Sequence, residues 1–511
     1  MISRLKDKDF RRSLYTVLKF IIAIVFTCLT YSTTKNATYI VVGFIELVLV
    51  FLIYNLIVDR HKFLQFCGNM LYFVYLAQMA VLYFGNSFTT LAMIKNIKFL
   101  KDLGGQAVTY ILGTVLVLFF VFLPGKAVVK TRKVYALVLV VLIVGEVFIN
   151  MDYKRFSPLQ SFGSLFTEEL RYQHVKRAAA DPEVALATFH KDGLTDAVAK
   201  PANLSEKPNI IVIFTEGLSY NIIADEEKDI MPNVREFEKS CITFKNYYNH
   251  TFPTLRGVQG QLYSGYKFDD DKQGNNLVSV QSVLKDQGYR TAFINTEPFN
   301  DEFTKYLNNL GFDEIIDDED NVSGLADGMT DGEAYRLLMD SAHDLAKDKD
   351  QPFMLGIYTF GTHVSFDSRE YQYGDGANGF LNKFYNCDQM FKYFLDDFKS
   401  SELADNTILI FTTDHSTYAD QSYTDVFTDY KRNCTDCDVM PLFIYYDGIE
   451  PQEIDADGRN SLCFAPTVLD FLDLDAENYF LGSSLFDPDG STTFDRMFYD
   501  AAFMISTKTT K

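Results

Sequence analysis

The sequence predicts two different structures joined end to end: an α-helical membrane bundle of five spans, followed by an α/β domain with a mostly parallel sheet. Long apolar stretches fill the first third of the 511-residue chain, and short runs rich in Ile and Val recur in the rest. The charge also changes sign. Residues 1–155 carry 18 Lys and Arg against 7 Asp and Glu, whereas the remainder carries 29 against 61.

Each of the five apolar stretches has the length that an α-helix needs to cross a hydrocarbon core of about 30 Å. They cover residues 14–32, 39–58, 68–85, 107–124 and 134–151. Buried helices of a soluble domain would instead repeat polar residues every three or four positions. Val134–Asn150 shows no such repeat. We therefore assign residues 1–151 to a five-helix transmembrane domain.

Basic residues are concentrated in alternate loops of this bundle. The N-terminal segment, the second-to-third loop and the fourth-to-fifth loop hold 5, 2 and 4 Lys and Arg, whereas the opposite loops hold four in all. Basic loops stay on the cytoplasmic side. The sequence therefore predicts a cytoplasmic N-terminus and, after five crossings, an extracellular location for everything beyond about residue 151.

Three ionisable residues fall within the predicted spans. Lys19 lies near a helix end, so we expect its side chain to reach the membrane interface. Glu46 and Glu146 are expected to pair with polar groups across the bundle, because a charge inside the hydrocarbon is costly.

Residues 152–207 form a linker in which Glu168–Ala180 is rich in helix-forming residues. From residue 208 to 511, short apolar runs alternate with longer amphipathic segments, the pattern of βαβ units. The predicted strands are 209–215, 291–295, 353–359, 407–413 and 441–446. The predicted helices include 278–287, 332–347 and 382–398.

Two of these strands end in charged residues. Glu216 directly follows the run Asn209–Thr215, and Asp414 with His415 directly follows Thr407–Thr413. Ligands of open α/β sheets bind at the carboxyl ends of the strands, so the three side chains are expected to meet. Such a set of oxygen and nitrogen ligands suits Mn, Mg or Zn. Each piece also has an ordinary interpretation, as a helix N-cap or a surface pair.

A loop between these strands, Asn249–Gly257, carries two candidate nucleophiles, Thr251 and Thr254. A hydroxyl bound to a divalent cation loses its proton more readily, and the cation also neutralises charge on a phosphoryl oxygen. The combination favours covalent catalysis on a phosphate ester. No glycine-rich phosphate loop follows a predicted strand, so no nucleotide cofactor is expected. The acidic outer part disfavours nucleic acid as a partner.

Taken in order, these motifs resemble the alkaline phosphatase/sulfatase superfamily, and the whole chain resembles its lipoteichoic acid synthase branch. The motifs are Asn209–Glu216, Thr254–Gly265, Thr362-His363, Thr412–His415 and Met440–Tyr446. The resemblance implies five membrane helices, a linker helix and an extracellular phosphotransferase domain.

The resemblance implies one divalent cation, Mn in the best-known members, held by four residues: Glu216, Thr254, Asp414 and His415. Thr254 would also be the nucleophile. His363 would bind or protonate the phosphate in transit, or be an ordinary hydrogen-bonded loop histidine. Arg256 would pair with the phosphate through its planar guanidinium, or point into solvent. Thr251 remains the alternative nucleophile.

The resemblance also places a head-group pocket around four residues: Glu297, Phe299, Asn300 and Asp301. The lipoteichoic acid enzymes have an arginine where this chain has Asp301. That reversal of charge would also suit a cationic head group such as ethanolamine. The sulfatases convert a Cys or Ser before x-Pro-x-Arg to formylglycine. Here that place holds Thr251, which cannot be converted, so hydrolysis of sulfate esters is disfavoured.

The expected reaction is a two-step transfer. Thr254 would attack a membrane phospholipid, phosphatidylglycerol in the first instance, and release diacylglycerol. The phospho-alcohol would then pass to a hydroxyl on an extracellular glycan or polymer. The alternatives are an extracellular phosphodiesterase or sulfatase-type hydrolase, and a non-catalytic sensor of lipid head groups.

Overall fold

The computed structural model describes residues 7–95, 105–130, 133–179, 181, 200–265, 278–322, 328–364, 366–368, 370–432, 437–478 and 480–490. The chain divides into two compact units, Met1–Leu170 with Ala419–Thr428 and Arg171–Tyr418 with Asp429–Lys511. The boundaries proposed above at residues 151 and 207 stay predictions, because this division does not locate a membrane surface.

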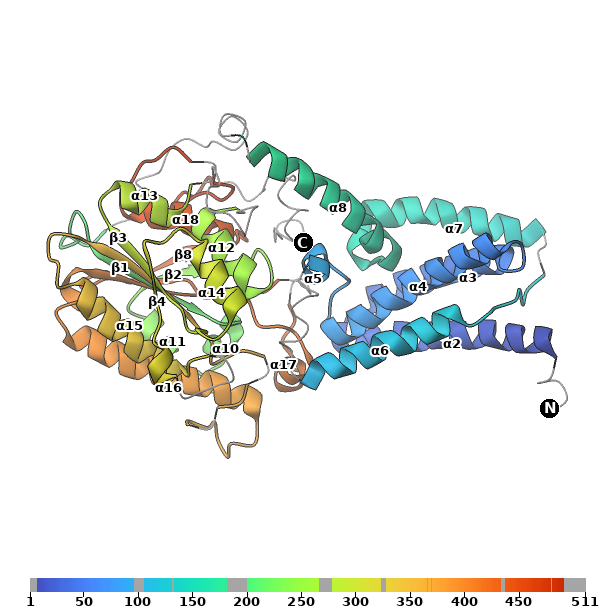
Figure 1. Ribbon diagram of the computed structural model, residues 1–511, viewed down its shortest axis with the longest axis horizontal. Coiled ribbons are helices and arrows are strands. Elements are labelled where there is room, and N and C mark those ends of the chain that lie inside the picture. Colours follow the sequence, from blue (N-terminus) through green and yellow to red (C-terminus); the bar gives the residue numbers. More distant parts are fainter. Residues whose placement is uncertain are drawn as a thin grey trace. The chain divides into compact units, whose positions relative to one another are not determined.

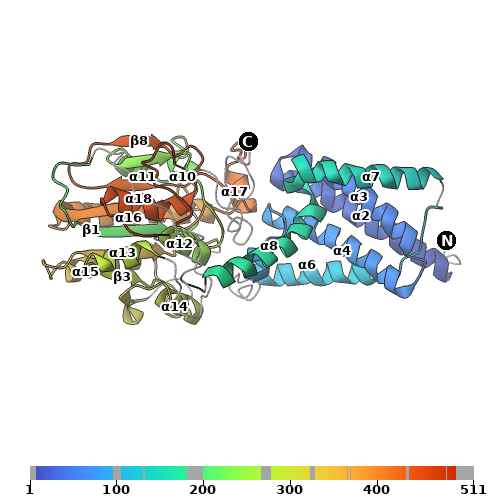
Figure 2. The ribbon, with the colours of Figure 1, turned by 90° about the horizontal axis from the view of Figure 1, so that it is seen from above.

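Five long helices lie side by side in the first unit (Figures 1 and 2). They are α2 (Lys8–Thr34), α3 (Ala37–Ile57), α4 (Lys62–Gly85), α6 (Gly105–Phe122) and α7 (Lys133–Asp152). Each coincides with one predicted span. Among the described residues, α2, α3, α4 and residues 134–151 of α7 are long and apolar enough to cross a membrane. The predicted helical membrane bundle is confirmed.

Lys19 does not reach the interface as expected. Its side chain is fully buried in the bundle, and its Nζ donates to Tyr54 Oη at 3.2 Å, Asn69 Oδ1 at 2.8 Å and the Val121 carbonyl at 2.9 Å. These acceptors lie on α3, α4 and α6, so the ammonium joins four helices through hydrogen bonds. Such a role depends on the packing of segments that are far apart in sequence.

Glu46 and Glu146 both contact the start of α8 (Pro158–Ala179). Glu46 accepts hydrogen bonds from the Ser157 hydroxyl and from the Leu159 backbone N–H, and Glu146 accepts from the Gln160 amide at 3.4 Å. The helix begins ten residues before the predicted start at residue 168. A Ser-Pro pair is a typical helix start. Residues 182–199 of the linker lie outside the described part of the chain.

An eight-stranded sheet forms the centre of the second unit. Its strands are β1 (Asn209–Thr215), β2 (Ile242–Lys245), β3 (Arg290–Ile294), β4 (Glu314–Ile316), β5 (Phe353–Thr359), β6 (Thr407–Thr413), β7 (Phe443–Tyr445) and β8 (Gln452–Asp455). The order is β4-β3-β5-β1-β6-β7-β2-β8, and only β7 runs antiparallel to its neighbours. The mostly parallel sheet is therefore confirmed. The short strands β2, β4 and β8 were not predicted.

Helices cover both faces of this sheet, with α12, α13 and α18 on one face and α11, α15 and α16 on the other (Figure 1). The remaining α-helices of the chain are α5 (Leu91–Lys95), α10 (Tyr220–Ala224), α11 (Pro232–Glu238), α12 (Thr254–Tyr263), α13 (Val280–Asp286), α14 (Asp301–Asn308), α15 (Asp331–Leu345), α16 (Gly379–Ser400), α17 (Gln421–Val426) and α18 (Phe464–Phe471). Within the described residues, the short 3₁₀ helices are η2 (Lys154–Phe156), η3 (Glu319–Asn321), η4 (Ala404–Asn406) and η5 (Ser461–Cys463).

The register of the two central strands determines where the charged residues lie. β1 and β6 are parallel neighbours, and Thr215 pairs with Thr413 at their last positions. Glu216 and Asp414 therefore leave the sheet side by side and at the same level. The convergence expected from the sequence follows directly from this pairing.

Candidate metal centre

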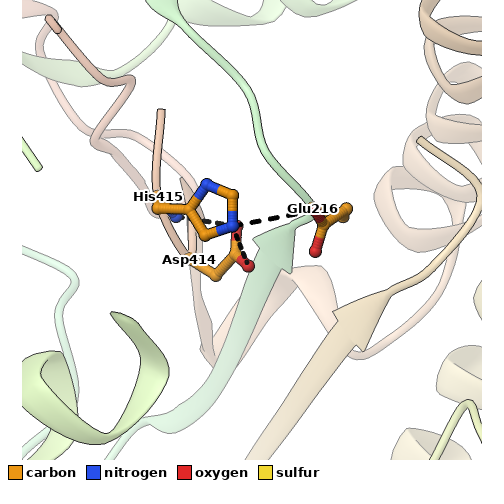
Figure 3. Close-up of side chains that lie close together, drawn as sticks. All are labelled: Glu216, Asp414 and His415. Carbon is orange, nitrogen blue, oxygen red and sulfur yellow. Dashed lines mark hydrogen bonds and ion pairs between the residues drawn. The ribbon is translucent and has the colours of Figure 1, made fainter. Parts of the chain in front are cut away.

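Glu216, Asp414 and His415 meet at the carboxyl ends of β1 and β6 (Figure 3). His415 Nε2 lies 3.4 Å from Asp414 Oδ2 and 3.7 Å from Glu216 Oε1. One ligand atom from each residue falls within 4.8 Å of the others, and all three side chains are buried. The structure therefore brings together the three predicted protein ligands from separate stretches of the chain.

The hydrogen bonds of Asp414 and His415 occupy one polar atom of each side chain and leave the other available to a cation. Asp414 Oδ1 accepts from the backbone N–H groups of Gly217 and His415, at 2.8 and 2.7 Å. His415 Nδ1 lies 2.7 Å from the Ser416 carbonyl, which requires a proton on Nδ1. The neutral ring then has its lone pair on Nε2. Within the described residues, Asp414 Oδ2 and His415 Nε2 have no hydrogen-bond partner.

Electrostatics at this point also favour a cation. Burial, and after it the negative charge of Glu216, raise the pKa of the Asp414 carboxyl from its usual 3.8 to about 7. Two ionised carboxylates in a buried site repel each other unless a positive charge lies between them. The donor set of two oxygens and one nitrogen fits Mn, Mg or Zn, so these residues fit a divalent cation.

Thr254 lies beside these ligands. It is the first residue of α12, and its Oγ1 donates to Glu216 Oε2 at 2.9 Å. Thr251 is 1% exposed, and its hydroxyl donates to the Phe252 carbonyl at 3.1 Å. Of the two candidate nucleophiles, the structure therefore joins Thr254 to the cluster by a hydrogen bond.

Tyr358 is a functional candidate that the sequence analysis missed. It lies on β5, next to β1, and its hydroxyl donates to Glu216 Oε2 at 2.6 Å. A tyrosine within a buried apolar strand looks like core in the sequence. The only available signal was its place, one residue before the end of a central parallel strand.

The backbone of α12 lies directly against the end of β6. A methyl group built on Gly257 would come within 2.2 Å of the Asp414 carbonyl oxygen. Gln261, one turn further along, donates its amide to the Thr413 carbonyl at 2.9 Å. Glycine therefore allows the close approach that sets the position of Thr254 relative to the ligands.

His363 is attached to the same cluster through its neighbour. The Thr362 hydroxyl donates to the Glu216 backbone carbonyl at 2.6 Å. The buried Lys383 on α16 donates its Nζ to the His363 carbonyl at 3.1 Å. These two bonds hold the loop after β5 beside the metal ligands, which is compatible with contact between His363 and a bound phosphate.

Arg256 lies in the first turn of α12, partly exposed, and its guanidinium donates to Gln259 Oε1 at 3.2 Å. The side chain is therefore held along its own helix.

The four residues of the expected head-group region follow β3. Glu297 is 7% exposed and accepts from the Asn300 amide at 2.9 Å. Phe299 is 52% exposed, and Asp301 begins α14 at the surface.

Two hydrogen bonds connect this region to the cluster. Thr296 donates to the Tyr358 carbonyl at 2.8 Å, and Tyr306 of α14 donates to the Leu255 carbonyl at 2.7 Å. The region therefore lies beside both Tyr358 and the first turn of α12.

Comparison with known proteins places this site in a family. The sequence profile described as Sulfatase matches residues 208–474, which is more than half of the chain. The chain belongs to the Sulfatase family. The matched range contains every residue of the cluster described above.

Three relatives are similar to different shares of this Sulfatase family chain. Lipoteichoic acid synthase 2 of Bacillus subtilis (strain 168) is 24% identical over 316 residues, 55% of this chain and 47% of that protein. The alignment thus spans about half of that relative. The lipoteichoic acid synthase LtaP from Listeria monocytogenes has a TM-score of 0.47 at 17% identity, covering 61% of this chain and 81% of its own.

The third relative is an integral membrane protein, the lipooligosaccharide phosphoethanolamine transferase A from Neisseria meningitidis. The TM-score is 0.52 at 12% identity, and the match covers 90% of this chain and 95% of that chain. This likeness concerns the fold. It extends over the apolar helices as well as the α/β domain, and so supports a multi-pass membrane protein with a sulfatase-like domain.

Metal binding should depend on pH in a defined direction. In the metal-free protein the raised pKa of Asp414 means that ionisation destabilises the fold as pH rises from about 4 to about 7. A cation needs the ionised form, so its stabilising effect should grow over the same range. We expect a fixed concentration of Mn²⁺, about 100 times its Kd at pH 8, to raise the Tm by about 5 °C at pH 8. The same concentration should raise the Tm by much less at pH 5, where the affinity is weaker.

The measurement is thermal unfolding of the metal-stripped full-length protein, with and without Mn²⁺, at the two pH values. Asp414→Asn is the control, because it keeps the shape of the side chain and removes the titration. An equal Tm shift at both pH values, or an undiminished shift in Asp414→Asn, would contradict the assignment.

Gly257→Ala should displace the candidate nucleophile without changing any polar group. The added methyl group forces α12 away from the Asp414 carbonyl, at a cost of about 1–3 kcal/mol in stability. A shift of about 1 Å at Thr254 should lower turnover by about two orders of magnitude. Turnover of the phospholipid expected from the sequence is measured as release of diacylglycerol from vesicles. Gly145→Ala on α7, where nothing lies within 4 Å of the new methyl, should leave turnover unchanged.

Proposed function

We propose that this protein is a membrane-anchored, metal-dependent phosphotransferase. It moves phosphoglycerol or phosphoethanolamine from a phospholipid to a hydroxyl on an extracellular glycan or polymer, through a phosphothreonine intermediate on Thr254. The observation that carries the proposal is the 2.9 Å hydrogen bond from Thr254 to Glu216, which places an alcohol beside three convergent metal ligands. Membership of the Sulfatase family supports chemistry on a phosphate or sulfate ester.

The first step forms a bond between Thr254 Oγ1 and phosphorus and breaks the bond to diacylglycerol. A bound divalent cation, with Mn the first candidate and Mg or Zn the alternatives, would favour ionisation of the Thr254 hydroxyl and neutralise charge on the phosphoryl oxygens. Glu216 accepts the hydrogen bond of that hydroxyl, and Tyr358 fixes the Glu216 carboxylate. His363 is the candidate donor of the proton that diacylglycerol takes up.

In the second step the acceptor hydroxyl attacks the same phosphorus and Thr254 leaves. The proton of the acceptor returns to Thr254 Oγ1, and the proton that Thr254 released in the first step restores His363, so the enzyme returns to its starting state. The N-terminus of α12 points its backbone N–H groups toward this phosphorus, which favours the negative charge that develops there. Arg256 is a further candidate for contact with the phosphate.

The head group is proposed to lie beside Glu297, Phe299, Asn300 and Asp301. A buried carboxylate at Glu297 and an exposed one at Asp301 would attract the ammonium of ethanolamine, and their oxygens would also accept hydrogen bonds from the hydroxyls of glycerol. A glycan or polymer acceptor would enter from the exposed side near Phe299. The basic cytoplasmic loops predicted from the sequence place this catalytic domain outside the cell.

The proposal is tested by the mass of the peptide that bears Thr254. After incubation of the full-length protein with phosphatidylglycerol, phosphatidylethanolamine and Mn²⁺, we expect an adduct of phosphoglycerol or phosphoethanolamine on Thr254. Thr254→Val should abolish both the adduct and the release of diacylglycerol. Thr251→Val is the matched control on the same loop and should retain the adduct.

The same experiment separates the rival functions. Radiolabelled head group that appears on an added acceptor indicates transfer, whereas free phospho-alcohol alone indicates a hydrolase. Lipid binding without any adduct would support a sensor and overturn the proposal.

The choice of head group should depend on Glu297. If its charge recognises an ammonium, Glu297→Gln should lower the preference for phosphatidylethanolamine over phosphatidylglycerol by about tenfold, the equivalent of about 1.4 kcal/mol. The ratio of the two adducts on Thr254, formed in vesicles with equal amounts of both lipids, measures this preference. Glu236→Gln, on α11 at the other face of the sheet, should leave the ratio unchanged. An unchanged ratio in Glu297→Gln would exclude recognition of a cation by this residue.

A further inference from the structure

Residues 158–170 of α8 carry an exposed apolar stripe. Phe162, Phe166 and Leu170 are 46%, 71% and 57% exposed. Because they follow one another at intervals of four residues, they lie on one face of the helix. We call these three residues the α8 stripe. All three belong to the first compact unit of the chain.

Glu46 indicates the depth at which this helix starts. It lies nine residues after Ala37, the first residue of α3, which corresponds to about 14 Å along the helix. Side chains of a helix tilt toward its N-terminus, so the carboxylate reaches to within about 10 Å of that end. The Ser157 hydroxyl and the Leu159 N–H both donate to it. The first turn of α8 is therefore held about 10 Å inside the end of the bundle at which α3 begins.

The chain around this turn has the charge pattern of a membrane interface. Lys154 and Arg155 are basic, and no charged residue occurs from Phe156 to Thr167. The uncharged part of α8 thus extends for ten residues, or about 15 Å, before Glu168. An amphipathic helix in the interface buries its apolar face about 5–10 Å deep and places basic residues near lipid phosphates. The start of α8 matches both requirements.

The stripe also continues a surface that already faces lipid. α7 ends at Asp152, one short 3₁₀ turn before α8. Near its end α7 exposes large apolar side chains, as a membrane span does: Val140, Val144, Val147, Phe148 and Met151. Phe156, the last residue of this turn, packs edge-on against Tyr39, with 4.9 Å between the ring centroids. The turn is thus fixed in the bundle, and the helix after it contacts α7 at its start, where the Gln160 amide donates to Glu146.

We propose that residues 158–170 of α8 form an in-plane membrane anchor. The α8 stripe lies among the acyl chains of the leaflet on the side where α7 ends, and Glu46 holds the start of the helix at that depth. Lys154 and Arg155 contact the phosphates of the same leaflet. This inference concerns the attachment of the catalytic domain and does not depend on the proposed reaction.

The absence of tryptophan from the chain allows a direct test. Phe166→Trp introduces a single tryptophan into the full-length protein, which is reconstituted in vesicles with and without bromine on the acyl chains. We expect brominated lipid to reduce its emission to about half, as for a side chain at interfacial depth. Phe148→Trp on α7 should be quenched too, whereas Tyr393→Trp, exposed on α16 of the second unit, sets the unquenched reference.

Emission of Phe166→Trp that is insensitive to brominated lipid would overturn the proposal, whether a second copy or another part of the chain covers the stripe. Phe162→Trp is the second variant in case the first does not fold, and carries the same expectation. Neither measurement requires turnover, so failure of the anchor and failure of the proposed reaction are distinguishable.

The part played by Glu46 is tested on the Phe166→Trp background. Glu46→Ala removes the acceptor for Ser157 and Leu159, so the helix start is released and the quenching by brominated lipid should fall at least twofold. Glu46→Gln keeps a side-chain oxygen at the same place and should retain the quenching. Equal quenching in all three proteins would show that Glu46 does not hold the helix.

Discussion

The structure depends on one electrostatic constraint, the burial of two carboxylates side by side at the ends of β1 and β6. Glu216 and Asp414 are 3% and 0% exposed, respectively, and a pair of like charges in such a place is unfavourable without a cation. The surrounding hydrogen bonds keep the pair in position and offset only part of this cost. Backbone N–H groups hold Asp414, and Tyr358 holds Glu216. The site gains stability once a cation binds, so metal binding and local order are coupled.

The geometry of parallel strands explains which residues of this site could be predicted from the sequence. Glu216 and Asp414 were predictable as partners because each directly follows a buried run of seven residues, and an in-register parallel pair makes the two run ends adjacent. Tyr358 and Gly257 were not predictable. Their roles arise from a hydroxyl that crosses between strands and from the distance between a helix and a strand end, and neither quantity has a sequence pattern.

The membrane part shows the same limit. The apolar lengths were enough to locate the helices, but not to place Lys19, which lies in the interior of the bundle because three acceptors from three other helices surround its ammonium. The start of α8 is a different case. Ser157 and Pro158 form a helix-start signal that was present in the sequence. The predicted start at residue 168 relied instead on the helix-forming residues that follow it.

The fold of the second unit does not by itself select a substrate, because the same fold supports different chemistries. Selection of a lipid would come from where the site is held. A catalytic domain joined to five membrane helices meets its donor in two dimensions, and tethering raises the effective concentration of a lipid without any new contact at the site. An anchor at the start of α8, as proposed above, would add a second attachment to the same leaflet. The residues that attach the domain are then as relevant to substrate choice as those that surround Thr254.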